Sequence, residues 1–209
     1  METGRRERKK QQTRQAISDV ATTLFLERGF DAVTVAEVAR AADVAVQTVF
    51  NHFPTKEDLF FDERGWWTGP ARAIREAPDG ADPVDVLEAH YLAEIRERLA
   101  VGHLATWKQF VRTIEDSAAL LARRRLNAAE MERLLTDALD ERNPEHLRSR
   151  LIAAQFAAAQ KVLEEELMRR LPDEATPGQL QQVQTELERA VAEVFGVLRH
   201  GLGLPATTA

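Results

Sequence analysis

The sequence contains no cysteine, so disulfides, thiolate metal sites and cysteine nucleophiles are all excluded. Its charged N-terminus runs into an amphipathic segment and lacks the continuous apolar core of a signal peptide. No window reaches an uninterrupted membrane-spanning length. We therefore expect a cytoplasmic protein with no membrane partner.

Catalytic motifs are also missing. The sequence has no glycine-rich phosphate loop, no His-Glu-x-x-His pair and no nucleophile elbow with a suitable histidine. Acidic residues gather where a solvated helix surface explains them, as in the run from Glu164 to Glu166. We therefore expect no enzyme, no catalytic residue, no metal and no cofactor. The five histidines lie without metal-ligand spacing, at His52, His90, His103, His146 and His200.

Charge is unevenly distributed along the chain. The formal net charge is -6, yet the stretch from residue 5 to residue 14 contains a single acid, Glu7. A local basic arm on an acidic body favours a confined contact with phosphate, and the acidic remainder resists nonspecific binding to nucleic acid. A disordered charged terminus explains the same residues equally well, so both interpretations stay open. The bases of this stretch are Arg5, Arg6, Arg8, Lys9, Lys10 and Arg14.

Sustained alternation of apolar and polar residues is absent too. The sequence is rich in Ala, Leu, Glu, Arg and Gln, punctuated by proline and glycine, which predicts an all-α protein. Its 209 residues allow a small domain joined to a larger one. We predict about nine helices, with a three-helix helix-turn-helix domain over residues 1–60 and a larger helical domain over residues 61–209.

The N-terminal part carries clear signals for helix ends. A stripe of apolar residues at positions 17, 20, 21, 24 and 25 predicts a first helix, which Gly29 can end in the left-handed conformation. Thr34 and Glu37 form the capping box of a second helix. A short third helix ends before Pro54, because proline cannot continue it, and Thr55 caps a fourth.

The second and third predicted helices have the arrangement of a helix-turn-helix. The third helix can then enter a DNA major groove, where Gln47 and Thr48 can exchange hydrogen bonds with base edges and Val46 can meet a thymine methyl. Lys56 lies in the first turn of the next helix, where the dipole disfavours a cation unless an anion such as phosphate is bound. Each residue alone is better explained as solvated surface, whereas the joint pattern favours DNA.

Residues 13–60, TRQAISDVATTLFLERGFDAVTVAEVARAADVAVQTVFNHFPTKEDLF, resemble the DNA-binding domain of the TetR family of bacterial transcriptional regulators. The matching positions include Thr13-Arg14, Gly29-Phe30, Thr34-Val35, His52-Phe53 and Lys56. The resemblance implies phosphate contacts at Thr34, Phe50, His52 and Lys56, and base reading by Ala45, Val46 and Gln47, with Ala36 contributing. We add Arg14 to the predicted phosphate contacts and Thr48 to the predicted base contacts.

Two positions depart from the family pattern. Phe50 replaces a frequent tyrosine, so a hydroxyl contact to phosphate would be lost there. Ala45 gives the third helix no side-chain cap.

The last two predicted helices, over residues 144–171 and 177–202, have the features of a dimer surface. Apolar residues repeat at three-four spacing along the last helix, and small residues allow the helix before it to approach another backbone closely. Two copies can form a four-helix bundle across a twofold axis, and the resemblance implies a homodimer. A purely intramolecular core is the competing interpretation. The predicted interface residues are Ala154, Ala158, Leu187, Val191, Val194 and Leu198.

The resemblance also implies that the C-terminal domain binds a small-molecule effector, whose identity is unknown. Trp107, Phe110 and Phe156 are the predicted apolar walls of its pocket, with His103 or Arg112 as orienting groups. Trp67 is a further candidate. Aromatic residues at helical spacing more often belong to a core than to a ligand site, so each of them alone is better explained by packing.

The function implied is that of a ligand-responsive repressor, which binds a palindromic operator in double-stranded DNA as a homodimer. The segment from Lys56 to about Gly69 is predicted to transmit the effector signal. The alternative is a helical protein-interaction module that has lost sequence-specific DNA binding, for which the phenylalanine at position 50 is a slight indication.

Overall fold

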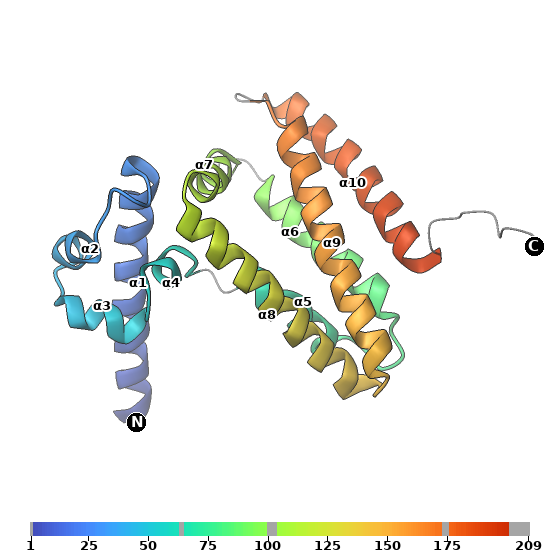
Figure 1. Cartoon of the computed structure of the whole chain (residues 1–209), viewed down its shortest axis with the longest axis horizontal. Coiled ribbons are helices and arrows are strands. Elements are labelled where there is room, and N and C mark those ends of the chain that lie inside the picture. Colours follow the sequence, from blue (N-terminus) through green and yellow to red (C-terminus); the bar gives the residue numbers. More distant parts are fainter. Residues whose placement is uncertain (1, 63–64, 100–103, 173–175, 201–209) are drawn as a thin grey trace, which may run out of the picture. The chain divides into compact units, whose positions relative to one another are not determined.

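The computed structural model describes residues 2–62, 65–99, 104–172 and 176–200. Over these ranges the chain forms ten α-helices and no strand, which confirms the all-α prediction (Figure 1). The count exceeds the expected nine because the predicted fourth helix is two helices, α4 and α5. The helices are α1 (Glu2–Arg28), α2 (Val35–Ala41), α3 (Val46–His52), α4 (Lys56–Phe60), α5 (Gly65–Glu76), α6 (Pro83–Arg98), α7 (Leu104–Glu115), α8 (Ala118–Arg142), α9 (His146–Arg170) and α10 (Pro177–His200).

The chain divides into two compact units. Unit 1 comprises Met1–Arg64 and Lys108–Arg125, and unit 2 comprises Gly65–Trp107 and Leu126–Ala209. Unit 1 thus contains the predicted N-terminal domain together with the end of α7 and the start of α8, a stretch that the sequence analysis assigned to the C-terminal domain. Within the described residues, no helix is both long and apolar enough to cross a membrane.

The helix ends in unit 1 follow the local sequence signals. Gly29 has a φ of 83°, the left-handed conformation predicted after the first helix. Thr34 and Glu37 form the predicted capping box of α2, and Thr55 and Asp58 form another at the start of α4. Asp43 adopts a φ of 53° in the turn between α2 and α3, a conformation that aspartate tolerates better than most residues.

In unit 1, α1 packs against α2, α3 and α4. Its core includes Ile17, Phe25, Val38 and Phe53, each at most 1% exposed. The segment 108–125 joins this core, because the ring of Phe110 stacks on Phe60 with a centroid distance of 4.7 Å and an interplanar angle of 9°. Two polar contacts hold the same segment: Ser117 Oγ lies 2.9 Å from Asp31 Oδ1, and Arg123 pairs with Asp58.

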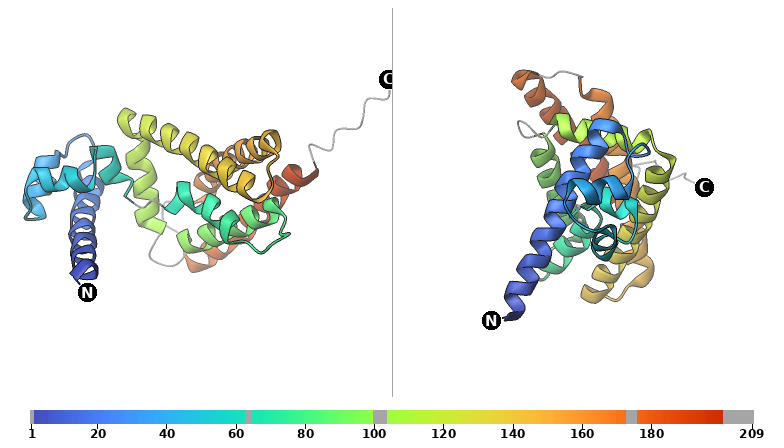
Figure 2. Two further views of the ribbon diagram at one scale, coloured as in Figure 1. Left: turned by 90° about the horizontal axis from the view of Figure 1, so that it is seen from below. Right: turned by 90° about the vertical axis from the view of Figure 1, so that its left-hand side faces the viewer.

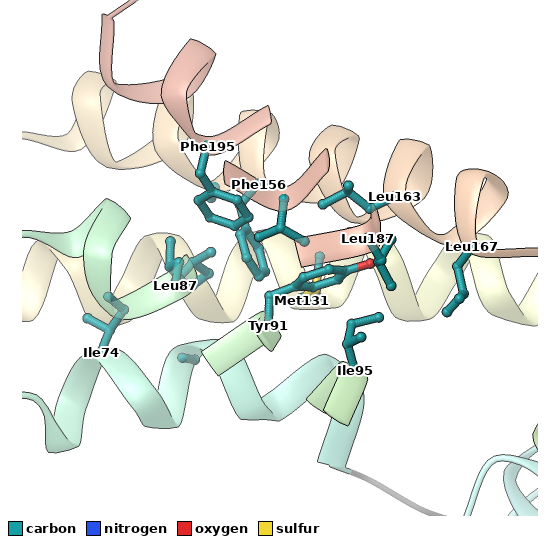
Figure 3. Packing of buried hydrophobic residues seen from close by; sticks show 14 of the residues in the cluster. Ile74, Leu87, Tyr91, Ile95, Met131, Phe156, Leu163, Leu167, Leu187 and Phe195 are labelled. Atoms are coloured by element: carbon teal, nitrogen blue, oxygen red, sulfur yellow. The ribbon is translucent and has the colours of Figure 1, made fainter. Parts of the chain in front are cut away.

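Unit 2 is built on α5, α6, α9 and α10, with the later turns of α8. Its apolar cluster includes Leu87, Met131, Phe156, Leu187 and Phe195, all at most 2% exposed (Figure 3). Helix α5 approaches α6 closely at Gly69, where an added Cβ would come within 2.8 Å of His90 Cε1. Any larger residue here would require the His90 ring to shift.

Candidate nucleic-acid interface

Helix α3 presents an exposed face with both apolar and polar groups. Val49 is buried at 1% exposure and attaches the helix to the core of unit 1, while Val46 and Phe50 remain 40% and 42% exposed. Ala45 precedes the helix as an exposed residue without a side-chain cap, as predicted, and Thr48 is half-buried. Helix α3 is therefore held by one side, and its opposite side can contact a major groove.

Two amides lie one turn apart on the exposed side of α3. Gln47 Nε2 donates to Asn51 Oδ1 across 3.1 Å, and both residues are exposed. This bond fixes the Gln47 side chain and leaves its oxygen, its second N–H and the Asn51 amino group available. Glutamine and asparagine amides match the donor and acceptor edge of adenine in the major groove. Asn51 was not among the predicted base contacts, although its spacing of four residues from Gln47 is a detectable signal.

The start of α2 is occupied by an internal network of hydrogen bonds. Glu37 accepts from the backbone amide of Thr34 at 2.8 Å and from its hydroxyl at 2.8 Å, and its own amide donates to Thr34 Oγ1 at 3.2 Å. The bond from the Thr34 amide and the neighbouring guanidinium of Arg28 lower the pKa of Glu37 to about 2. The predicted phosphate contact of Thr34 thus lies beside a carboxylate that pairs with Arg28, and Ala36 is exposed next to it.

Arg14 and His52 join α1 to the end of α3. Arg14 Nη1 donates to the backbone oxygen of His52 across 2.6 Å, the guanidinium pairs with Asp62, and its carbon lies 4.1 Å from the centroid of the Phe53 ring. Burial, with the charges of Arg14 and Lys10, lowers the pKa of His52. Arg14 therefore has a structural role, and its predicted phosphate contact stays a prediction.

Lys56 also has a partner inside unit 1. Its Nζ donates to the backbone oxygen of Phe30 across 2.6 Å and lies 4.1 Å from the centroid of the same residue's ring. This carbonyl and ring provide the negative surroundings that the sequence analysis assigned to a phosphate. An ammonium group has three donors, so the contact leaves two for another acceptor.

The predicted effector residues lie in both units. Trp67, Trp107 and Phe156 belong to unit 2, where the two tryptophans pack against the apolar cluster and Phe156 is 1% exposed within it. Phe110 and Arg112 belong to unit 1, where the Phe110 ring stacks on Phe60 and Arg112 is exposed. His103 lies outside the described residues.

Three polar groups of α6 are buried without a hydrogen-bond partner in the part of the chain that the structure describes. They are His90 Nε2, Tyr91 Oη and Glu94 Oε2. Tyr91 is 2% exposed and points from α6 into the apolar cluster beside Leu187 (Figure 3). Burial raises the pKa of Tyr91 and of Glu94 and lowers that of His90. His90 Nε2 and Glu94 Oε2 still have ionic contacts of 3.5 Å, to Glu94 Oε1 and to Arg98 Nη2 respectively. The Tyr91 hydroxyl has no such contact, which is unfavourable by about 1–3 kcal/mol. The sequence gives little warning of them, because burial is what makes them unusual.

The predicted dimer residues differ in exposure. Leu187 and Val191 are 0% exposed and pack in the core of unit 2, Val194 and Leu198 lie partly buried against it, and Ala154 and Ala158 are exposed. Helix α9 carries additional exposed apolar side chains, which the interface prediction did not include. These are Leu147 at 82%, Leu151 at 56% and Val162 at 54% exposure.

Within the described residues, no three His, Asp or Glu side chains gather closely enough to hold a metal ion.

The chain is similar to known regulatory proteins. Residues 17–62 match the family model of bacterial regulatory proteins, tetR family. The HTH-type transcriptional regulator TcmR of Streptomyces glaucescens is 29% identical over 180 residues, which cover 78% of this chain and 76% of that protein.

Two solved structures share the fold. Native NalD of Pseudomonas aeruginosa, described as the secondary repressor of the MexAB-OprM multidrug efflux pump, has a TM-score of 0.60 at 22% identity, covering 90% of this chain and 96% of its own. The SmeT–triclosan complex has a TM-score of 0.59 at 15% identity, covering 88% and 90% of the two chains.

Proposed function

Because this chain is a TetR-family transcriptional regulator by virtue of its N-terminal helix-turn-helix domain, we propose that it binds a palindromic operator in double-stranded DNA as a ligand-responsive homodimeric repressor. The observation that carries the proposal is the exposed side of α3, where the Gln47–Asn51 amide pair lies beside Val46 and Phe50. Amides read adenine, and apolar groups pack against thymine methyls, so this face suits sites containing A·T pairs.

The proposed dimer surface is the exposed apolar side of α9. Leu147, Leu151, Ala154, Ala158 and Val162 follow one another at intervals of four, three, four and four residues, which places them along one face of the helix. Exposed apolar side chains in a continuous row are characteristic of interfaces. A second copy of the chain is the proposed occupant, because two copies of α9 and α10 would form a four-helix bundle and present two recognition helices to one palindrome.

The proposed effector site lies in unit 2, around the buried polar groups of α6. A ligand that brings a hydrogen-bond partner to Tyr91 would remove the cost of burying its hydroxyl alone. SmeT is described in complex with triclosan, so binding of a small molecule has a parallel among the structural neighbours. To act as an inducer, the effector must favour the conformation that does not bind DNA by its difference in affinity for the two states.

Selection of bound duplexes from a random DNA pool tests the DNA-binding role. We expect an enriched palindrome, with specificity relaxed at one base pair of each half-site by Gln47→Ala. Gln181→Ala, an exposed glutamine change in unit 2, provides the matched control and should leave the selected sequence unchanged. A folded dimer that enriches no sequence, even at low salt, would favour the interaction-module alternative instead.

A further inference from the structure

The first turns of α1 carry cations that are not used in folding. Helix α1 begins at Glu2, residues 6–12 are exposed, and burial begins only at Ile17. In the part of the chain that the structure describes, no carboxylate pairs with Arg6, Lys9 or Lys10. Arg8 donates to the carbonyl of Gly4 at 3.1 Å, one turn earlier in the same helix.

This charge arrangement is unfavourable for the isolated chain. The main cause is repulsion between the cations themselves, because the helix dipole acts mainly within the first turn and these residues lie beyond it. Arg6 lies three and four residues before Lys9 and Lys10, the spacings at which like charges on a helix repel one another. The helix continues because arginine, lysine and glutamine are good helix formers. A polyanion alongside these turns would relieve this repulsion.

The cationic turns begin where the recognition helix ends. Arg14 is bonded to the backbone oxygen of His52, the last residue of α3, and Lys10 lies one turn earlier, close enough for its charge to lower the pKa of His52. From there α1 projects beyond the rest of unit 1 (Figure 2). At 1.5 Å per residue, Arg6 lies about 12 Å farther along the axis than Arg14. That reach exceeds the width of a DNA minor groove, about 6 Å.

We infer that Arg6, Lys9 and Lys10 form a second DNA contact, which binds backbone phosphates beside the groove that α3 occupies. The inference rests on the proposed operator binding and extends it. The occupant is duplex DNA, because the cations continue the helix that holds α3, and because the remainder of this acidic chain would repel a polyanion elsewhere. Such contacts read no sequence, so they add affinity equally at every site.

The test uses the full-length triple variant Arg6→Ala, Lys9→Ala, Lys10→Ala. Alanine preserves the helix, and these side chains contact no core, so the fold is retained. Each phosphate contact contributes about 0.9 to the slope of log affinity against log salt, and a dimer would have up to six. We expect the slope to become shallower by about 5, with the selected operator sequence unchanged. The control removes three exposed cations elsewhere, through Arg75→Ala, Arg125→Ala and Arg133→Ala.

Phosphate ethylation interference locates the contact. On the wild-type complex, ethylation should interfere both at the groove that α3 enters and at phosphates beside it, and the triple variant should lose only the second group. An unchanged slope with an unchanged interference pattern would overturn the inference while leaving operator binding intact. An equal loss of slope in the control would also overturn it, since net charge alone would then be the cause. Absence of salt-sensitive binding by the wild type would overturn both proposals.

Discussion

Replacing Lys56 with methionine removes the ammonium group while keeping the length of the side chain. In the wild type, Lys56 Nζ donates to the buried Phe30 carbonyl across 2.6 Å and lies 4.1 Å from the centroid of the Phe30 ring. A hydrogen bond to a charged group contributes about 1.5–3 kcal/mol, and a partly exposed cation above an aromatic ring about 0.5–1 kcal/mol. Lys56 is partly exposed, so solvent screening reduces both terms, and the burial that lowers the pKa of Lys56 opposes them. We therefore expect a net loss at the lower end of their sum, about 2 kcal/mol.

Hydrogen exchange can measure this loss in unit 1 specifically. All three tryptophans, Trp66, Trp67 and Trp107, belong to unit 2, so their fluorescence does not report on unit 1. Peptides covering residues 46–60 do, and a loss of 2 kcal/mol should speed their exchange by roughly 30-fold. Lys161→Met removes an exposed lysine of unit 2 and should leave these peptides unchanged. Unchanged protection in Lys56→Met would refute the claim that the Phe30 contact stabilises the fold.

Further predictions concern DNA affinity, assembly and unit 2. Phe50→Tyr adds a hydroxyl at a position that is 42% exposed, and operator titration should show binding tighter by roughly 2- to 10-fold; equal affinity would mean that the hydroxyl reaches no phosphate. Leu151→Glu places a charge on the proposed dimer surface, at a position that is 56% exposed in the single chain, and an unpaired charge buried in an interface is unfavourable. Sedimentation at micromolar concentration should therefore show monomers, whereas a persisting dimer would exclude the α9 surface as the dimer interface. Gly69→Ala should lower the melting temperature, because its Cβ would lie 2.8 Å from His90 Cε1. In a His90→Ala background the same change should raise the melting temperature, because the helix propensity of alanine then prevails. A change of the same sign in both backgrounds would contradict the close approach. Burial and the charges of Arg72 and Arg98 hold the pKa of His90 below its ordinary value of 6.5. The unfolded chain therefore binds a proton at this histidine at higher pH than the folded chain does, and the free energy of unfolding should fall as the pH drops below 6.5. His90→Ala should reduce this fall in urea titrations, and an identical pH dependence would remove His90 as its cause.

Several long-range contacts in unit 1 could not be predicted from the sequence. Ser117 and Asp31 are 86 positions apart, and Arg123 and Asp58 are 65 positions apart. Both pairs join the segment 108–125 to the rest of unit 1. Phe110 appeared from its type and spacing to be a candidate for the effector pocket. Its ring stacks on Phe60 in unit 1, a partner that no local pattern indicates.

The periodicity of the last helix was ambiguous for a related reason. Leu187 and Val191 repeat at the spacing of an apolar helix face, and this spacing is the same whether the face meets the chain's own helices or a second copy. The structure buries both within unit 2. The exposed apolar row of α9 was harder to detect, because alanines interrupt its larger side chains.

The sequence by itself determined the features that depend on neighbouring residues: the all-helical class, the left-handed Gly29, the capping boxes at Thr34 and Thr55, and the helix-turn-helix pattern. These are local because a helix end is satisfied by groups within three or four residues of it. Only the tertiary structure decided what each exposed-looking side chain contacts, as for Lys56, which bonds a carbonyl 26 residues away. The reason is physical: burial and hydrogen bonding depend on which distant segments meet, and helical periodicity specifies that a face is covered without specifying what covers it.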